Sequence, residues 1–123
     1  MVIIGSRSIK EFDLTRYVPQ DVDTIITGGA DGMDKIAEEY ADKHKLSKYV
    51  IRPRYDRYKK NAPLIRNRQM IDMADYILIV WDGVSRGTKS AIEYIEKKDI
   101  RRPTAIIYRL ERAKTIHTAS GEA

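Results

Sequence analysis

The stretch Thr27-Gly28-Gly29-Ala30-Asp31-Gly32-Met33-Asp34 decides how this chain folds. The apolar pair Ile25-Ile26 precedes it, and a segment with helical periodicity follows it. Glycines at a strand-to-helix turn let the backbone approach a phosphate closely, and the N-terminus of the helix offers free N–H groups and partial positive charge. The stretch therefore predicts an α/β unit with an anion-binding site where the strand ends.

A second glycine turn, Gly83-Val84-Ser85-Arg86-Gly87-Thr88, also lies between a predicted strand and a predicted helix. A third turn, Gly5-Ser6-Arg7, follows the first predicted strand, and its arginine can bind a phosphate with two parallel hydrogen bonds. In a parallel sheet these turns converge on one edge, at the carboxyl ends of the strands. Their convergence indicates a nucleotide or another phosphorylated ligand.

Short apolar runs alternate with helical patterns along the chain. The predicted strands cover 2–4, 24–27, 48–52, 76–80 and 104–108, and the helical patterns cover 11–18, 33–43, 61–74 and 88–95. The strands are continuously apolar or β-branched, as expected for strands that are buried on both faces. This order predicts an α/β fold, a three-layer Rossmann-like sandwich with a mainly parallel five-stranded sheet. We expect one domain over 1–110, followed by a C-terminal extension or tail over 111–123.

The composition limits the chemistry. The chain has 123 residues, a formal net charge of +5 and no cysteine, which excludes disulfides, thiolate catalysis and thiolate metal sites. We expect a cytoplasmic protein without a membrane partner, without a metal site and without a required cofactor. A homodimer or a higher homo-oligomer is expected, because domains of this type often pair through helix faces.

The candidate site residues follow from the turns and from the start of the third predicted helix. Asp31 is a candidate helix cap, whereas Asp34 can bind a ribose hydroxyl or orient Arg7. The candidate ligand-binding residues are Gly5, Ser6, Arg7, Gly28, Gly29, Ala30, Gly32, Asp34, Arg66, Asn67, Asp82, Gly83, Ser85, Gly87 and Thr88.

Taken together and in this order, the three glycine turns and the Arg66-Asn67 pair resemble the SLOG superfamily of Rossmann-like domains. That group includes the DNA-processing protein DprA, the LOG phosphoribohydrolases and small YspA-like proteins. The likeness extends to about Tyr108 and is greatest for the compact YspA-like branch. It implies a nucleotide-derived ligand, such as a nucleotide or an ADP-ribose-like molecule, lying over the glycine turns.

The resemblance departs from the LOG pattern in one important place. LOG enzymes carry Pro-Gly-Gly-x-Gly-Thr-x-x-Glu, whose glutamate takes part in cleaving the bond between base and ribose. In this chain the segment opens with Trp81-Asp82-Gly83, and the position four residues after Gly87 is Ala91. The remaining acid–base candidates are Asp82 and Asp34.

Three functions are consistent with these residues. The leading hypothesis is a small module that binds a nucleotide-derived ligand and acts as a sensor, carrier or regulator. The second is a LOG-like enzyme that hydrolyses an N-glycosidic or phosphoribosyl bond. The third is DprA-like binding of single-stranded DNA through the basic, tyrosine-containing stretch 52–68, with Arg54, Arg57 and Lys60 as contact candidates.

Overall fold

The computed structural model describes residues 1–97, 104–109 and 112–117. Its strands are β1 (Val2–Gly5), β2 (Thr24–Thr27), β3 (Ser47–Val50), β4 (Tyr76–Trp81), β5 (Thr104–Arg109) and β6 (Arg112–His117). Its α-helices are α1 (Met33–Lys43), α2 (Tyr55–Tyr58), α3 (Ala62–Asp72) and α4 (Arg86–Lys97), and two 3-10 turns are η1 (Leu14–Arg16) and η2 (Lys59–Asn61).

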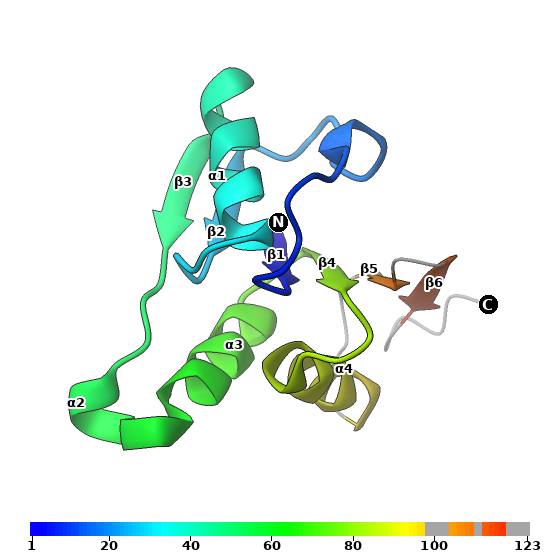
Figure 1. The fold of residues 1–123 in the computed structure, drawn as a ribbon. Helices are drawn as coiled ribbons and strands as arrows, with labels where there is room; N and C mark the ends of the chain where they lie inside the picture. Colours follow the sequence, from blue (N-terminus) through cyan, green and yellow to red (C-terminus); the bar gives the residue numbers. More distant parts are fainter. Residues whose placement is uncertain (98–103, 110–111, 118–123) are drawn as a thin grey trace.

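The strands form one sheet in the order β3-β2-β1-β4-β5-β6 (Figure 1). The first five are parallel to one another, which confirms the predicted α/β fold. From β1 the chain moves outward through β2 to β3 and then returns to β4 on the other side of β1. The reversal leaves a topological switch point between β1 and β4, where ligands bind in sheets of this kind.

Helices cover both faces of the sheet, so the molecule has three layers (Figure 1). Side chains along β1 alternate between the two faces of the sheet, and each face packs against its own layer of helices. Ile3 faces the core that contains Met33 of α1, while Val2 and Ile4 face the core that contains Met70 of α3 and residues of α4. Because both faces of the central strands are buried, their sequences read as continuous apolar runs.

Two segments differ from the predictions. The helical pattern 11–18 is reduced to the single turn η1, because Pro19 prevents a longer helix and the Asp13 carboxylate accepts the Thr15 N–H at 3.0 Å. The second difference is the strand β6, which pairs antiparallel with β5 inside the region predicted as an extension or tail.

Within the described parts of the chain, no helix combines the length and the apolar character needed to span a bilayer.

Candidate functional site

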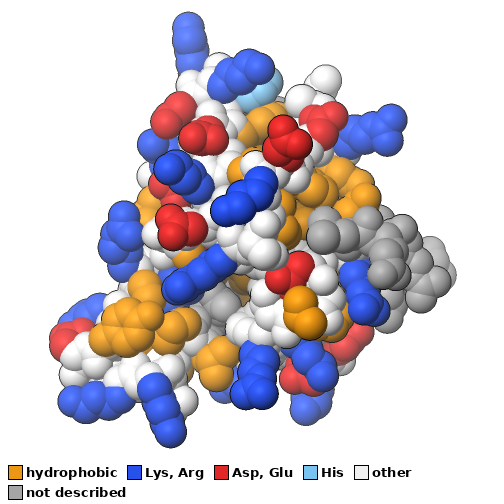
Figure 2. All heavy atoms as spheres, in the orientation of Figure 1, with side chains coloured by type: hydrophobic (Ala, Val, Ile, Leu, Met, Phe, Trp, Pro, Cys, Tyr) orange, Lys and Arg blue, Asp and Glu red, His pale blue; other side chains and the backbone are white. Residues whose placement is uncertain are grey.

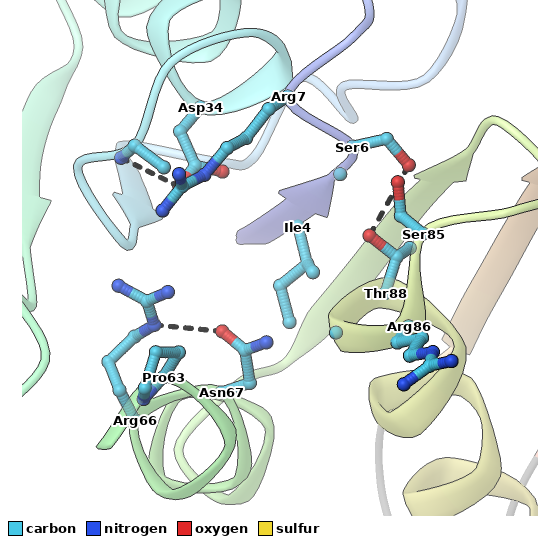
Figure 3. Close-up of a pocket in the computed structure, with 13 residues that line it drawn as sticks. Ile4, Ser6, Arg7, Asp34, Pro63, Arg66, Asn67, Ser85, Arg86 and Thr88 are labelled. Carbon is cyan, nitrogen blue, oxygen red and sulfur yellow. Dashed lines mark hydrogen bonds between the residues drawn. The ribbon is translucent and has the colours of Figure 1, made fainter. Parts of the chain in front are cut away.

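A pocket of about 380 Å³ lies at the carboxyl end of β1, between the N-terminal turns of α3 and α4 (Figure 3). Its position is the switch point between β1 and β4. The lining residues come from the end of β1, from the three glycine turns and from α3: Ile4, Gly5, Ser6, Arg7, Ala30, Asp34, Pro63, Arg66, Asn67, Ser85, Arg86, Gly87 and Thr88.

The pocket therefore contains most of the residues predicted from sequence. Gly28, Gly29, Gly32, Asp82 and Gly83 are the predicted ligand-binding residues that do not line it. Sequence reasoning missed Ile4, Pro63 and Arg86 as lining residues. Two of these could have been predicted from sequence, because Pro63 lies at the predicted start of the third helix and Arg86 lies inside the second glycine turn. Ile4 could not, because its sequence context is that of a buried strand residue.

Ser6 joins the ends of the two strands that flank the switch point. Its N–H donates to the Val80 carbonyl at 3.1 Å, and its hydroxyl oxygen accepts the Asp82 N–H at 3.1 Å. The same hydroxyl lies 3.4 Å from that of Thr88 on α4. Ser6 thus ties β1, β4 and the start of α4 together at the rim of the pocket.

The glycines of the turn 28–34 serve close packing between chain segments. A Cβ at Gly28 would lie 2.3 Å from the Arg66 guanidinium. Gly32 has a φ of 74°, and a Cβ there would approach the carbonyl oxygen of Arg7 to 2.4 Å. The sequence predicts that the glycines of this turn hold a phosphate directly. In the structure, however, the residues of the turn that line the pocket are Ala30 and Asp34, and its glycines do not line it.

Asp34 is a buried carboxylate in the wall of the pocket, with 5% of its surface exposed. Burial raises the pKa of Asp34 to about 6, although the Ala30 N–H, the Arg66 charge and the Gly28 N–H act in the opposite direction. The Ala30 N–H donates to its Oδ2 at 3.1 Å. A carboxyl group with this pKa can hold or release a proton near neutral pH.

Arg66 uses its donors mainly on the protein itself. Its Nη1 donates to the carbonyl oxygens of Gly28 at 2.6 Å and Ile51 at 3.3 Å, and its Nε donates to Oδ1 of Asn67 at 2.8 Å. Arg66 is 8% exposed. The sequence predicts Arg66 to be a ligand-binding cation, and the structure adds a role in fixing the turn after β2 against α3.

The N-terminus of α4 opens into the pocket. The N–H groups of Arg86, Gly87 and Thr88 have no hydrogen-bond acceptor among the described residues, as is usual for a first helical turn. A Cβ at Gly87 would meet no atom within 4 Å, so the backbone is open to an approaching ligand there. Free N–H groups at a helix N-terminus favour an anion at such a position.

Asp82 organises the loop that leads into α4. Its carboxylate accepts the N–H groups of Val84 at 2.9 Å and Ser85 at 2.8 Å, and also the hydroxyls of Ser85 and Ser8. Partial desolvation acts to raise the pKa of Asp82, but these four hydrogen bonds outweigh it and hold the pKa well below its usual range. A carboxylate held ionised in this way is suited to capping a loop and poorly suited to donating a proton.

The contact candidates of the basic stretch, Arg54, Arg57 and Lys60, do not line the pocket. They lie on or directly before α2 and η2, which extend away from the sheet (Figure 1). Arg54 forms an exposed ion pair with Asp56 at 3.1 Å, and Arg57 lies over the Tyr58 ring. Lys60 is exposed. In Figure 2, Lys and Arg side chains surround hydrophobic ones at the lower left, where α2 lies.

Among the described residues there is no group of three or more His, Asp and Glu side chains that could hold a metal ion.

Comparison of the chain with protein-family models, with curated proteins and with solved structures finds no match. The resemblance to the SLOG superfamily thus stays a prediction.

Proposed function

We propose that this protein binds a nucleotide-derived ligand through a phosphate group, as a sensor, carrier or regulator. The observation that carries the proposal is the open N-terminus of α4 in a pocket at the switch point of the sheet. Unsatisfied N–H groups and the helix dipole both favour a phosphate at that point.

The other charges of the pocket support the same ligand class. Arg7 and Arg86 line the pocket with exposed side chains, and Arg66 lies in its wall. Asp34 supplies an acceptor for hydroxyl groups. Cations and N–H donors for a phosphate, together with one carboxylate for hydroxyls, correspond to the polar groups of a ribose phosphate.

A thermal-shift screen tests this proposal with nucleoside monophosphates, NAD, ADP-ribose and a short oligonucleotide. A ligand present at 100 times its Kd should stabilise the fold by about 2.7 kcal/mol. The variant Gly87→Leu should remove the shift while keeping the fold, because its side chain enters open space beside the pocket.

Neutralising Arg54, Arg57 and Lys60 together is the matched control for the basic stretch. This triple variant should keep the shift produced by a mononucleotide, because none of its changes touches the pocket. A shift with the oligonucleotide alone, lost in the triple variant and in high salt, would favour single-stranded DNA binding instead.

A second candidate function, hydrolysis of an N-glycosidic or phosphoribosyl bond, is favoured by one observation. Asp34 is buried in the pocket wall with a pKa of about 6, which suits a general acid or base. The geometry favours Asp34 over Asp82, whose oxygens are occupied by the loop. Chromatography of nucleoside monophosphates incubated with the protein should then reveal free base, and Asp34→Asn should abolish its release. Intact nucleotides after long incubation would exclude this function.

A further inference from the structure

Arg66 fixes the orientation of the Asn67 amide. A guanidinium carries donors and no acceptor, so the atom of Asn67 that faces Arg66 Nε at 2.8 Å has to be the carbonyl oxygen Oδ1. Rotation of the amide by half a turn would place two donors against each other. Because Arg66 is itself held by the Gly28 and Ile51 carbonyls, this constraint belongs to the fold and is present before any ligand binds.

The amide nitrogen of Asn67 is consequently left with its donors unused. Asn67 is only 8% exposed, lines the pocket and has no acceptor for Nδ2 among the described residues. No buried side-chain nitrogen or oxygen of the described residues lacks a hydrogen-bond partner, so this nitrogen is open to the pocket and free to donate to a ligand there. The nitrogen points away from Arg66, toward the side of the pocket formed by α4 (Figure 3).

The groups on that side of the pocket define which ligand group the Asn67 nitrogen can bind. The start of α4 contributes the N–H groups of Arg86, Gly87 and Thr88. The carboxylate among the lining residues, Asp34, comes from α1 at the opposite wall (Figure 3). A ligand group that satisfies Asn67 and α4 together therefore needs several acceptor oxygens and negative charge.

We infer that Asn67 is a specificity-determining residue whose amide nitrogen donates to a phosphate oxygen of the ligand, in an orientation set by Arg66. This inference rests on the proposed function. It places the phosphate between α3 and α4, and the hydroxyl-bearing part of the ligand toward Asp34. Asn67 thereby selects a phosphate monoester over a compound that carries an ammonium group, which has donors and no acceptor, at this end.

Asn67→Asp tests the inference because it replaces the donor Nδ2 with an acceptor oxygen while keeping the shape of the side chain. The new carboxylate still accepts from Arg66 and gains its charge as a partner, so the fold should keep its melting temperature. Toward a phosphate it presents a like charge in place of a donor. Calorimetric titration should show affinity for adenosine 5′-monophosphate, ribose 5-phosphate and inorganic phosphate falling by about 30-fold or more.

Two further variants complete the experiment. Asn67→Leu removes the donor without adding charge and should weaken phosphate binding by about 10-fold. If Asn67→Asp fails to fold, the affinity of Asn67→Leu tests the inference instead. Asn61→Asp adds the same charge at an exposed position that precedes α3 and does not line the pocket, so its affinity should stay within about 2-fold of the unmodified protein.

The outcomes separate this inference from the proposed function. If the unmodified protein binds none of the three phosphates, both are overturned. If it binds them and folded Asn67→Asp binds them equally well, the role of Asn67 is wrong and the proposed function stands. If the nucleotide loses affinity while inorganic phosphate does not, Asn67 contacts the nucleoside part and the inference is again overturned.

Discussion

Asp34 and Asp82 are two carboxylates near the same edge of the sheet, and their surroundings move their pKa values in opposite directions. Asp34 is buried and accepts few hydrogen bonds, so its neutral form is favoured and its pKa is raised. Asp82 accepts four hydrogen bonds, which favour its ionised form despite partial desolvation. Residue type alone does not separate them, since each follows a strand near a glycine. Their roles depend on contacts between segments far apart in the sequence.

The pH dependence of stability should reveal Asp34. Its pKa is about 6 in the folded state against 3.8 in the reference state, so the folded protein binds more protons between these values. The contribution of Asp34 to the free energy of unfolding therefore falls as the pH rises from about 4 through 6, by about 3 kcal/mol in total. Asp34→Asn should remove this loss and stabilise the protein at pH 8, as measured by urea unfolding at pH 4.5 and pH 8.

Asp31→Asn is the control for that comparison, because Asp31 is an exposed carboxylate in the same turn. It should keep the pH dependence of the unmodified protein. Equal unfolding free energies of Asp34→Asn and the unmodified protein at both pH values would mean that Asp34 is not desolvated in solution.

At the scale of elements, the sequence predicts which turns meet but not what each glycine does. Gly28 and Gly32 allow other parts of the chain to pack against the turn, whereas Gly87 leaves open space at the start of α4. All three read alike in a sequence, as glycines between a strand and a helix. The atoms that a Cβ would meet belong to Arg66 and to the segment after β1, and these are distant in the chain. Contacts between segments so far apart in the chain leave no pattern in the local sequence around each glycine.

Substitution of two glycines by alanine should give opposite results. Gly32→Ala places a Cβ on a residue with a φ of 74° and against the Ser6 and Arg7 carbonyls, so we expect it to lower the unfolding free energy by about 2 kcal/mol or more. Gly87→Ala is in a helix with free space around the new methyl group and should leave stability unchanged or raise it by up to about 1 kcal/mol. Thermal unfolding measures both, and similar losses in the two variants would contradict this assignment.

The loop before α4 should depend on Asp82 for its shape. Asp82→Ala removes the acceptor for two backbone N–H groups and two hydroxyls, so we expect a loss of about 2 kcal/mol. Asp82→Asn retains an acceptor oxygen and should lose less. Chemical denaturation at pH 7 checks the order. A fully stable Asp82→Ala would show that the loop is held by other contacts.

At the scale of the whole molecule, the sequence predicts the parallel sheet because its strands, such as 76–80, are long apolar runs separated by helical patterns. It does not predict β6. Residues 112–117 contain three charged or imidazole side chains and little apolar periodicity, and their strand conformation comes from pairing with β5. Likewise, the segment 11–18 has apolar residues at helical spacing, yet its aromatic rings pack on β5, with Phe12 and Tyr108 5.2 Å apart. Tertiary contacts override the local pattern in both segments.

Removal of β6 tests whether the domain ends near residue 110, as the sequence suggests, or includes the sixth strand. A chain that stops after Arg109 loses the whole antiparallel ladder from Thr104 paired with His117 to Arg109 paired with Arg112. The edge of β5 then presents unpaired N–H and carbonyl groups, and Ala105 and Ile107 of this strand are buried in the sheet core. We expect the shortened chain to melt about 10 °C lower and to self-associate, as seen by thermal unfolding and by light scattering after gel filtration. An unchanged melting temperature with an unchanged mass would instead place the domain boundary near residue 110 and make β6 an accessory strand.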